Sequence, residues 1–219
     1  MKELRGKGVL LNNLEEAVWK HSNKITGETL DEALNAGIAP DDIRHALLQG
    51  FEHVRRRLMS NEVSIPDMLL CIDRVTEGLN SISGGKATEE GIPLVIGVVE
   101  GDPHDLGKNI IARIYKTYGY RVFDLGRDVP GKLFVKGVQE NKANVLALSA
   151  MMSTTMVEMR EIIQEVKVKS PGTAIIVGGA PVDETLARSW GADGYAETAV
   201  TVLEETQAAI GRVREGIPW

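Results

Sequence analysis

Several features that often reveal a protein's class are scarce or missing in this chain of 219 residues. It holds a single cysteine, Cys71, which excludes an intramolecular disulfide and a cysteine-based zinc site. Because its neighbours in sequence are Leu70 and Ile72, we expect Cys71 to lie in the core. Lys and Arg number 25 against 31 Asp and Glu, and the resulting net charge of −6 argues against a nucleic-acid-binding surface.

Long apolar runs are also missing. No segment is long enough to cross a membrane, and no signal peptide or transit segment is recognisable. We therefore expect a cytoplasmic protein without a membrane partner. The basic cluster Arg55-Arg56-Arg57 is short and has acidic residues nearby, which is typical of a solvated helix face.

A polar, glycine-rich segment at residues 84–91 divides the chain and is predicted to be a linker between residues 1–83 and 92–219. In the first part, apolar residues recur at helical spacing and predict an all-α domain of four helices. These helices are expected at residues 10–21, 26–36 with a cap at Thr26, 40–60 and 65–82.

The second part alternates between short apolar runs and amphipathic segments. Strands are predicted at residues 92–99, 122–125, 145–149, 174–177 and 194–195. Helices are predicted from about residue 107 onward and at 133–139, 156–168, 184–190 and 200–214. This alternation predicts an α/β fold, a flavodoxin-like or Rossmann-like doubly wound parallel sheet.

The most informative segment follows the first predicted strand. It reads Gly101-Asp102-Pro103-His104-Asp105, and the next helix begins near Gly107. The histidine is thus expected at the carboxyl end of a strand, where open α/β sheets bind their ligands. A carboxylate two residues earlier can hold one nitrogen of the imidazole and leave the other for a metal.

The spacing Asp102-x-His104-x-x-Gly107 resembles the signature of cobalamin-binding domains, in which the histidine replaces dimethylbenzimidazole as the lower ligand of cobalt. This resemblance implies that His104 is the axial cobalt ligand. The alternative interpretation of Asp102 or Asp105 is a helix N-cap with a favourable dipole interaction.

Two further segments carry the same resemblance. Ser149 ends the third predicted strand with Ser153 four positions on, and the fourth strand runs into Gly178-Gly179, as in the cobalamin family. Thr155 matches the position of a hydroxyl that completes a His–Asp–hydroxyl relay, although the best-known members carry serine there. The resemblance implies cofactor contacts from Asp102, His104, Asp105, Gly107, Ser149, Met151, Ser153, Thr155, Gly178 and Gly179.

These residue types suit the cofactor that the resemblance implies. Its nucleotide tail has to pass between the sheet and its helices, where glycine and serine leave room and hydroxyls can satisfy polar atoms. A proton moving on and off the imidazole can follow the change in cobalt ligation, since cobalt(I) sheds its lower ligand and methylcobalt(III) keeps one.

The helical part resembles the cap domain of small corrinoid proteins from methyl-transfer systems. The matching segments are Ile38-Ala39-Pro40, Gly50-Phe51-Glu52 and residues 62–66. The chain departs from the family at Ser64, where members usually carry an aromatic residue. Ile65, Met68 and Leu69 are therefore the candidates for covering the methyl group, and residues 83–85 are the expected hinge of the cap.

The resemblance as a whole implies a corrinoid methyl carrier, without a catalytic site of its own, whose cofactor is cobalamin or a related corrinoid. A substrate-specific methyltransferase would load cobalt(I) from methanol, a methylamine, a betaine or an aryl methyl ether. A second methyltransferase, linked to tetrahydrofolate or a thiol, would unload methylcobalt(III), and a reductive activator would restore the cofactor.

Three alternatives remain open on the sequence alone. The chain could be the small subunit of an adenosylcobalamin mutase, although such subunits commonly lack a helical cap. It could be a cobalamin-based sensor, although no basic helix-turn-helix is evident. It could also be a cofactor-free flavodoxin-like or receiver domain, which would stay colourless with hydroxocobalamin.

Overall fold

The computed structural model describes residues 2–20, 23–82 and 91–219, which form two compact units, residues 1–89 and 90–219. The predicted hinge at residues 83–85 lies outside the described residues, as does the predicted linker except for Gly91. Within the described ranges, no helix combines the length and the apolar character that crossing a membrane requires.

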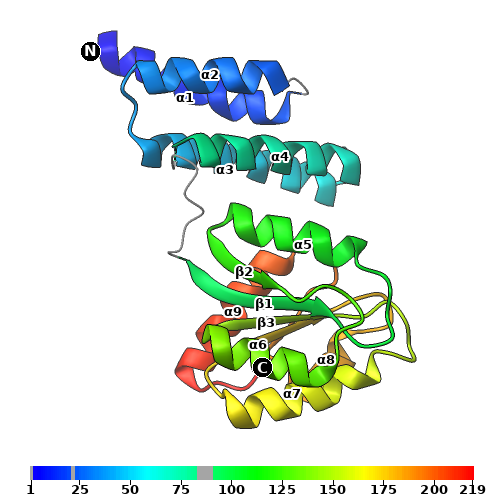
Figure 1. The fold of residues 1–219 in the computed structure, drawn as a ribbon. Helices are drawn as coiled ribbons and strands as arrows, with labels where there is room; N and C mark the ends of the chain where they lie inside the picture. The colour runs from blue at the N-terminus through cyan, green and yellow to red at the C-terminus, as the bar shows by residue number, and fades with distance from the viewer. Residues whose placement is uncertain (1, 21–22, 83–90) are drawn as a thin grey trace. The chain divides into compact units, whose positions relative to one another are not determined.

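The first unit consists of helices α1 (Lys2–Trp19), α2 (Asn23–Asn35), α3 (Pro40–Met59) and α4 (Ile65–Ile82), shown in blue to cyan in Figure 1. Pro40 begins α3 and two acidic residues follow it in the first turn, a favourable combination at a helix N-terminus. Helix α2 begins before Thr26, so the predicted cap there is wrong. Cys71 is 1% exposed, as expected for a core residue.

Ser64, where the family pattern has an aromatic residue, precedes α4 and binds the side chain of Asp67. The Ser64 N–H and hydroxyl both donate to Asp67 Oδ2, at 2.8 and 2.6 Å. This is the return half of a capping box, which supplies an acceptor to an N–H group that the helix leaves unpaired. The departure from the family pattern therefore has a local structural role.

The second unit is built on a five-stranded parallel sheet in the order β2-β1-β3-β4-β5. The strands are β1 (Ile92–Val98), β2 (Tyr120–Asp124), β3 (Val145–Ser149), β4 (Ala174–Gly178) and β5 (Gly194–Tyr195). The helices are α5 (Leu106–Thr117), α6 (Gly131–Asn141), α7 (Val157–Lys169), α8 (Glu184–Trp190) and α9 (Val202–Glu215). The predicted doubly wound parallel sheet is confirmed.

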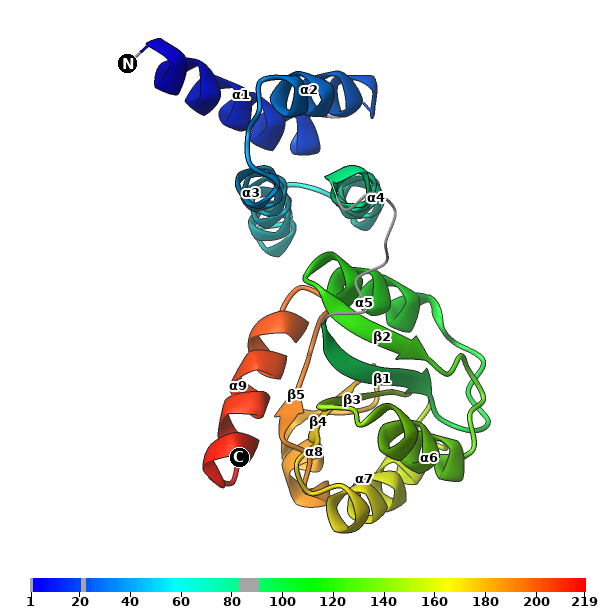
Figure 2. The same ribbon diagram turned by 60° about the vertical axis from the view of Figure 1, so that its left-hand side comes forward.

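Helices cover both faces of this sheet (Figure 2). Helix α5 packs on β1 and β2 and helix α9 on β4 and β5 of one face, while α6 and α7 lie together on the other. The chain leaves β1 toward β2 on one side and later returns to β3 on its other side. After β1 the chain continues to α5 on one face of the sheet, and after β3 it continues to α7 on the other face. Ligands of doubly wound folds bind at such a switch point.

Candidate functional site

The loops after β1 and β3 meet at Asp102. Its side chain is completely buried, and its Oδ1 atom accepts hydrogen bonds from the backbone N–H of His104 at 3.0 Å and the Nδ1 atom of its ring at 2.8 Å. Its Oδ2 atom accepts from the backbone N–H groups of Met151 and Met152, at 2.6 and 3.2 Å, and from the Thr155 hydroxyl at 3.0 Å. One carboxylate thus joins the two loops.

These contacts also fix the charge of Asp102. Burial alone would raise its pKa, but the hydrogen bonds from Met151, His104 and Thr155 lower the pKa to about 2. Asp102 is therefore ionised at neutral pH and can only accept. The His104 ring then carries its proton on Nδ1 and leaves the lone pair of Nε2 unused.

His104 itself is open to the outside of this unit. Its side chain is 57% exposed, whereas that of Asp102 is fully covered. A buried anion that orients an exposed imidazole is the arrangement found behind histidine ligands of metals. Thr155, itself buried, has its hydroxyl 3.0 Å from both Asp102 Oδ2 and the Met152 carbonyl oxygen. Since both are acceptors, its single proton serves one of them at a time.

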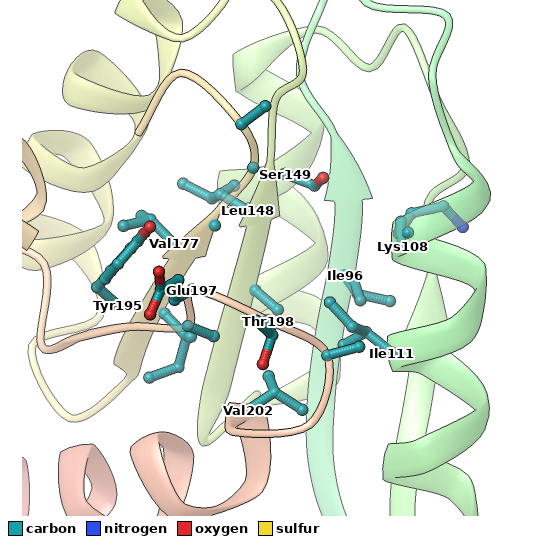
Figure 3. Close-up of a pocket in the computed structure, with 18 of the residues that line it drawn as sticks. Ile96, Lys108, Ile111, Leu148, Ser149, Val177, Tyr195, Glu197, Thr198 and Val202 are labelled. Atoms are coloured by element: carbon teal, nitrogen blue, oxygen red, sulfur yellow. The ribbon is translucent and has the colours of Figure 1, made fainter. Parts of the chain in front are cut away.

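A cavity of about 450 Å³ opens between α5 and α9, above the part of the sheet that neither helix covers (Figure 3). Its walls are mainly small or apolar residues from β1, β3, β4 and the segment after β5. The lining residues include Ile96, Gly107, Lys108, Ile111, Ala147, Ser149, Met151, Gly178, Gly179, Ala180, Tyr195, Glu197, Thr198 and Val202.

The glycines of this cavity differ in what they allow. A Cβ atom on Gly107 would meet nothing within 4 Å, so this glycine leaves open space. A Cβ atom on Gly178 would lie 2.9 Å from the Ala196 carbonyl oxygen, and one on Gly179 would lie 1.7 Å from that of Ala150. Gly179 also has φ +123°, so both positions are required by the fold itself.

The predicted site residues fall into three groups. Gly107, Ser149, Met151, Gly178 and Gly179 line the cavity, whereas Asp102, His104 and Thr155 form the hydrogen-bonded chain. Asp105 and Ser153 belong to neither group. Asp105 stands at the N-cap position of α5 without a capping bond, and Ser153 is exposed.

No sequence pattern indicated the cavity residues that follow β5. Tyr195, Glu197 and Thr198 line the cavity together with Val202, which begins α9. They follow a strand of only two residues and carry no recognisable pattern. Only their position after a parallel strand could have indicated them. The carboxyl end of β5 lies at the same end of the sheet as those of β3 and β4, where ligands bind.

The chemistry of the site fits the implied cofactor. In the part of the chain that the structure describes, no group of three or more His, Cys, Asp or Glu residues could hold a metal ion. A metal bound by His104 would therefore have to bring most of its own ligands, as a corrin ring does for cobalt. The open space beside Gly107 and the cavity lined by small residues suit the extended tail of such a cofactor.

Comparison with known proteins decides between the alternatives. B12 binding domain families match residues 92–204 and residues 10–82. A trimethylamine corrinoid protein of Methanosarcina barkeri is 34% identical over 215 residues, with 94% of this chain and 99% of the relative covered. The chain belongs to the corrinoid proteins of methyltransferase systems. A corrinoid protein of Desulfitobacterium hafniense is 32% identical over 212 residues, with 93% and 98% covered.

Solved structures agree. A cobalamin-binding protein from Desulfitobacterium hafniense matches with a TM-score of 0.79 and 28% identity, covering 92% of this chain and 98% of that one. A chain of the methanol:cobalamin methyltransferase complex from Methanosarcina barkeri matches with a TM-score of 0.80 and 28% identity, covering 92% and 80%. This corrinoid protein thus binds cobalamin or a related corrinoid and carries methyl groups for a methyltransferase.

Proposed function

We propose that His104 is the axial ligand of the corrinoid cobalt and that the cavity between α5 and α9 receives the nucleotide tail. The observation that carries this proposal is the pair formed by the buried Asp102 and the exposed His104 ring, 2.8 Å apart. The pair lies at the carboxyl edge of the sheet, where Met151 both donates to Asp102 and lines the cavity. One set of loops can therefore serve metal and tail together.

When bound, the corrinoid supplies a cobalt centre that takes up and gives up the methyl group. The protein's own residues orient the His104 imidazole that would bind the cobalt. Asp102 keeps the proton on Nδ1 and so presents the Nε2 lone pair for ligation. Asp102 would stabilise a positive charge on the imidazole when Nε2 holds a proton, and the Thr155 hydroxyl donates to the same carboxylate.

The methyl donor is proposed to be a methylated amine, with methanol as the second candidate. Corrinoid proteins for trimethylamine and dimethylamine are among the relatives, and a methanol system is among the similar structures. In this proposal a second methyltransferase removes the methyl group, a reductive activator restores an oxidised cofactor, and all of these proteins meet in the cytoplasm. The second partner, the activator and the location remain predictions from the sequence.

The ligand assignment is tested by the spectrum of the full chain loaded with hydroxocobalamin. We expect about one equivalent to bind with the tail base detached and histidine attached to cobalt. His104→Ala should convert the visible spectrum to that of a water-ligated form, whereas His45→Ala, an exposed residue of α3, should leave it unchanged. If His104→Ala keeps the spectrum of the parent protein, another residue holds the cobalt and the assignment is wrong.

The donor is tested separately. The reduced, loaded protein is offered to the trimethylamine or the methanol methyltransferase of its relatives, each with its own donor, and methylation is followed by absorbance. Faster methylation from trimethylamine supports the proposal, and faster methylation from methanol would replace the proposed donor while leaving the carrier role intact.

A further inference from the structure

The loop between β2 and α6, residues 125–130, runs beside the loop that carries His104. Main-chain bonds join the two: the Val98 N–H donates to the Gly126 carbonyl at 3.0 Å, and the Val129 N–H donates to the Val98 carbonyl at 3.1 Å. Val99 and Val129 form a parallel bridge just beyond them. The β2–α6 loop therefore pairs with the chain at the end of β1, although none of its residues lines the cavity.

Asp128 adds a side-chain bond to this main-chain contact. Its Oδ1 atom accepts from the Gly101 N–H at 2.7 Å. Asp128 has φ +54°, in the left-handed region where side chains other than those of Asn and Asp are unfavourable. Glycine occupies this region without strain, as Gly126 does in the same loop at φ +91°. An aspartate at this position contributes what a glycine would lack, the carboxylate acceptor.

The partner of Asp128, Gly101, also has Thr155 as a neighbour. Gly101 has φ +79°, and a Cβ atom placed on it would lie 3.3 Å from Cγ2 of Thr155. Gly101 thus lies between the β2–α6 loop and the hydroxyl residue that binds Asp102. Because it directly precedes Asp102, the direction of its peptide sets where the turn from Asp102 to His104 begins.

The other end of the His104 loop is joined to β2, the strand that precedes the β2–α6 loop. Lys108, in the first turn of α5, is 2% exposed, and its ammonium lies 2.7 and 2.6 Å from the two carboxylate oxygens of Asp124 at the end of β2. Figure 3 shows this ammonium pointing away from the cavity. Arg127 adds a longer contact to the Pro103 carbonyl, at 3.4 Å. The loop is therefore fixed at its beginning and at its end.

We propose that Asp128 is a positioning residue for the axial ligand: its bond to Gly101 holds the Asp102–His104 turn in the geometry that presents Nε2 to cobalt. This inference rests on the proposed role of His104. It assigns a function to a side chain that touches neither the imidazole nor the cavity.

The test compares variants of the full chain that separate the acceptor from the backbone strain. Asp128→Gly removes the acceptor, and glycine adopts the same positive φ, so a loss does not come from new backbone strain. Asp128→Asn keeps an oxygen acceptor and tolerates a positive φ. Lys142→Gly relieves a similar φ of +48° after α6, at the opposite edge of the sheet, and serves as the control.

Three measurements are made on each protein. The first is the affinity for aquacobinamide, which lacks the nucleotide tail and so depends more strongly on the axial ligand. The second is the nitrogen splitting of cobalt(II) in the electron paramagnetic resonance spectrum of the loaded protein. The third is the hydrogen exchange of the Gly101 amide in the protein without corrinoid.

Asp128→Gly should accelerate exchange at Gly101, weaken cobinamide binding by about three- to tenfold, as the loss of one hydrogen bond predicts, and reduce the nitrogen-split signal. In Asp128→Asn and in Lys142→Gly, the exchange at Gly101, the affinity for cobinamide and the nitrogen splitting should all stay at the values of the parent protein. Faster exchange at Gly101 with parental affinity and splitting would show that Asp128 only braces the loop, and the proposal would be wrong. A parent protein without nitrogen splitting would instead refute the role of His104.

Discussion

Asp102 is the residue on which the geometry of the site depends. All five groups that bind its carboxylate are donors: three backbone N–H groups, the His104 ring and the Thr155 hydroxyl. An amide in its place would turn an NH₂ group toward one of these donors, so Asp102→Asn cannot conserve the network. Removing an acceptor from a buried cluster of donors costs stability as well as orientation.

The pKa of Asp102 predicts a pH dependence of the apoprotein. Because the pKa is lowered from 3.8 to about 2 in the folded state, the stabilisation is complete above the unfolded pKa and is lost as pH falls toward 2. This contribution amounts to about 2–3 kcal/mol. The difference in unfolding free energy between the parent and Asp102→Asn should therefore shrink as the pH is lowered from 6 to about 3.

Urea unfolding followed by tryptophan fluorescence in a Trp19→Phe background measures this in the second unit. Asp183→Asn is the control, because Asn also caps a helix and Asp183 accepts from the Leu186 N–H at the start of α8. A difference for Asp102→Asn that stays constant with pH would mean that the carboxylate is not the group responsible.

Among single residues, the sequence predicted site residues that lie close together in the chain just after a strand. It did not predict residues whose role depends on contacts with distant parts of the chain. Asp102 and His104 are two positions apart after a clear apolar strand, so their proximity is local. Asp128 left no signal, because its role depends on a left-handed backbone and on Gly101, which lies far away in sequence. Asp105 lies within the same segment but does not line the cavity, since position in a loop does not determine where a side chain points.

At the scale of elements, the cavity exists because α5 and α9 lie apart and the strands between them end in small residues. Ser149 ends β3 and pairs in register with Val98 and Gly178, so it lies at the centre of the uncovered strip. Gly178→Leu would collide with the Ala196 carbonyl even without a ligand, so it cannot report on the tail alone. Ser149 is the better probe.

We expect Ser149→Leu to weaken binding of complete cobalamin far more than binding of cobinamide. The added side chain would occupy tail space, an overpacking penalty of about 1–3 kcal/mol when the tail is bound. Ser149→Ala removes the hydroxyl without adding volume and should have a small effect on both. Isothermal titration of both corrinoids gives the comparison, and an equal loss for the two would mean that Ser149 belongs to the core and not to the tail site.

The elements themselves were predictable because their apolar periodicity is strong. Helix α4 and strands β3 and β5 have the bounds that the sequence predicted. The predicted bounds are wrong where the apolar pattern is weak. Helix α1 begins at Lys2 and not at residue 10, where the apolar stripe begins. Strand β2 begins at Tyr120, which is buried, and not at residue 122. Helix α6 starts at Gly131, directly after Pro130 at its N-cap position, because proline has no N–H to donate and cannot lie inside a helix.

At the scale of the molecule, each unit has a core of its own. Fully buried residues of the helical unit include Leu14, Val18, Ile43, Leu47, Phe51, Met68 and Val75. Met68 is therefore not available to cover a methyl group, and this candidate from the sequence is wrong. Met59, Ile65 and Leu70 are 57%, 42% and 44% exposed around the α3–α4 turn, which leaves one end of the bundle apolar and accessible in that unit.

Removing residues 1–82 tests what this bundle contributes. Because the sheet, Asp102, His104 and the cavity all belong to residues 90–219, we expect the remaining chain to fold and to bind corrinoid with histidine attached. If the apolar end of the bundle covers the upper face of the cofactor, the shortened protein should lose methyl groups to light faster, since radicals would escape instead of recombining. The rate of photolysis, compared with that of the full chain and of an Ile65→Ser variant, measures this protection. Equal rates in all three would show that the bundle does not cover the methyl group, and its function would then lie in contact with the partner methyltransferase.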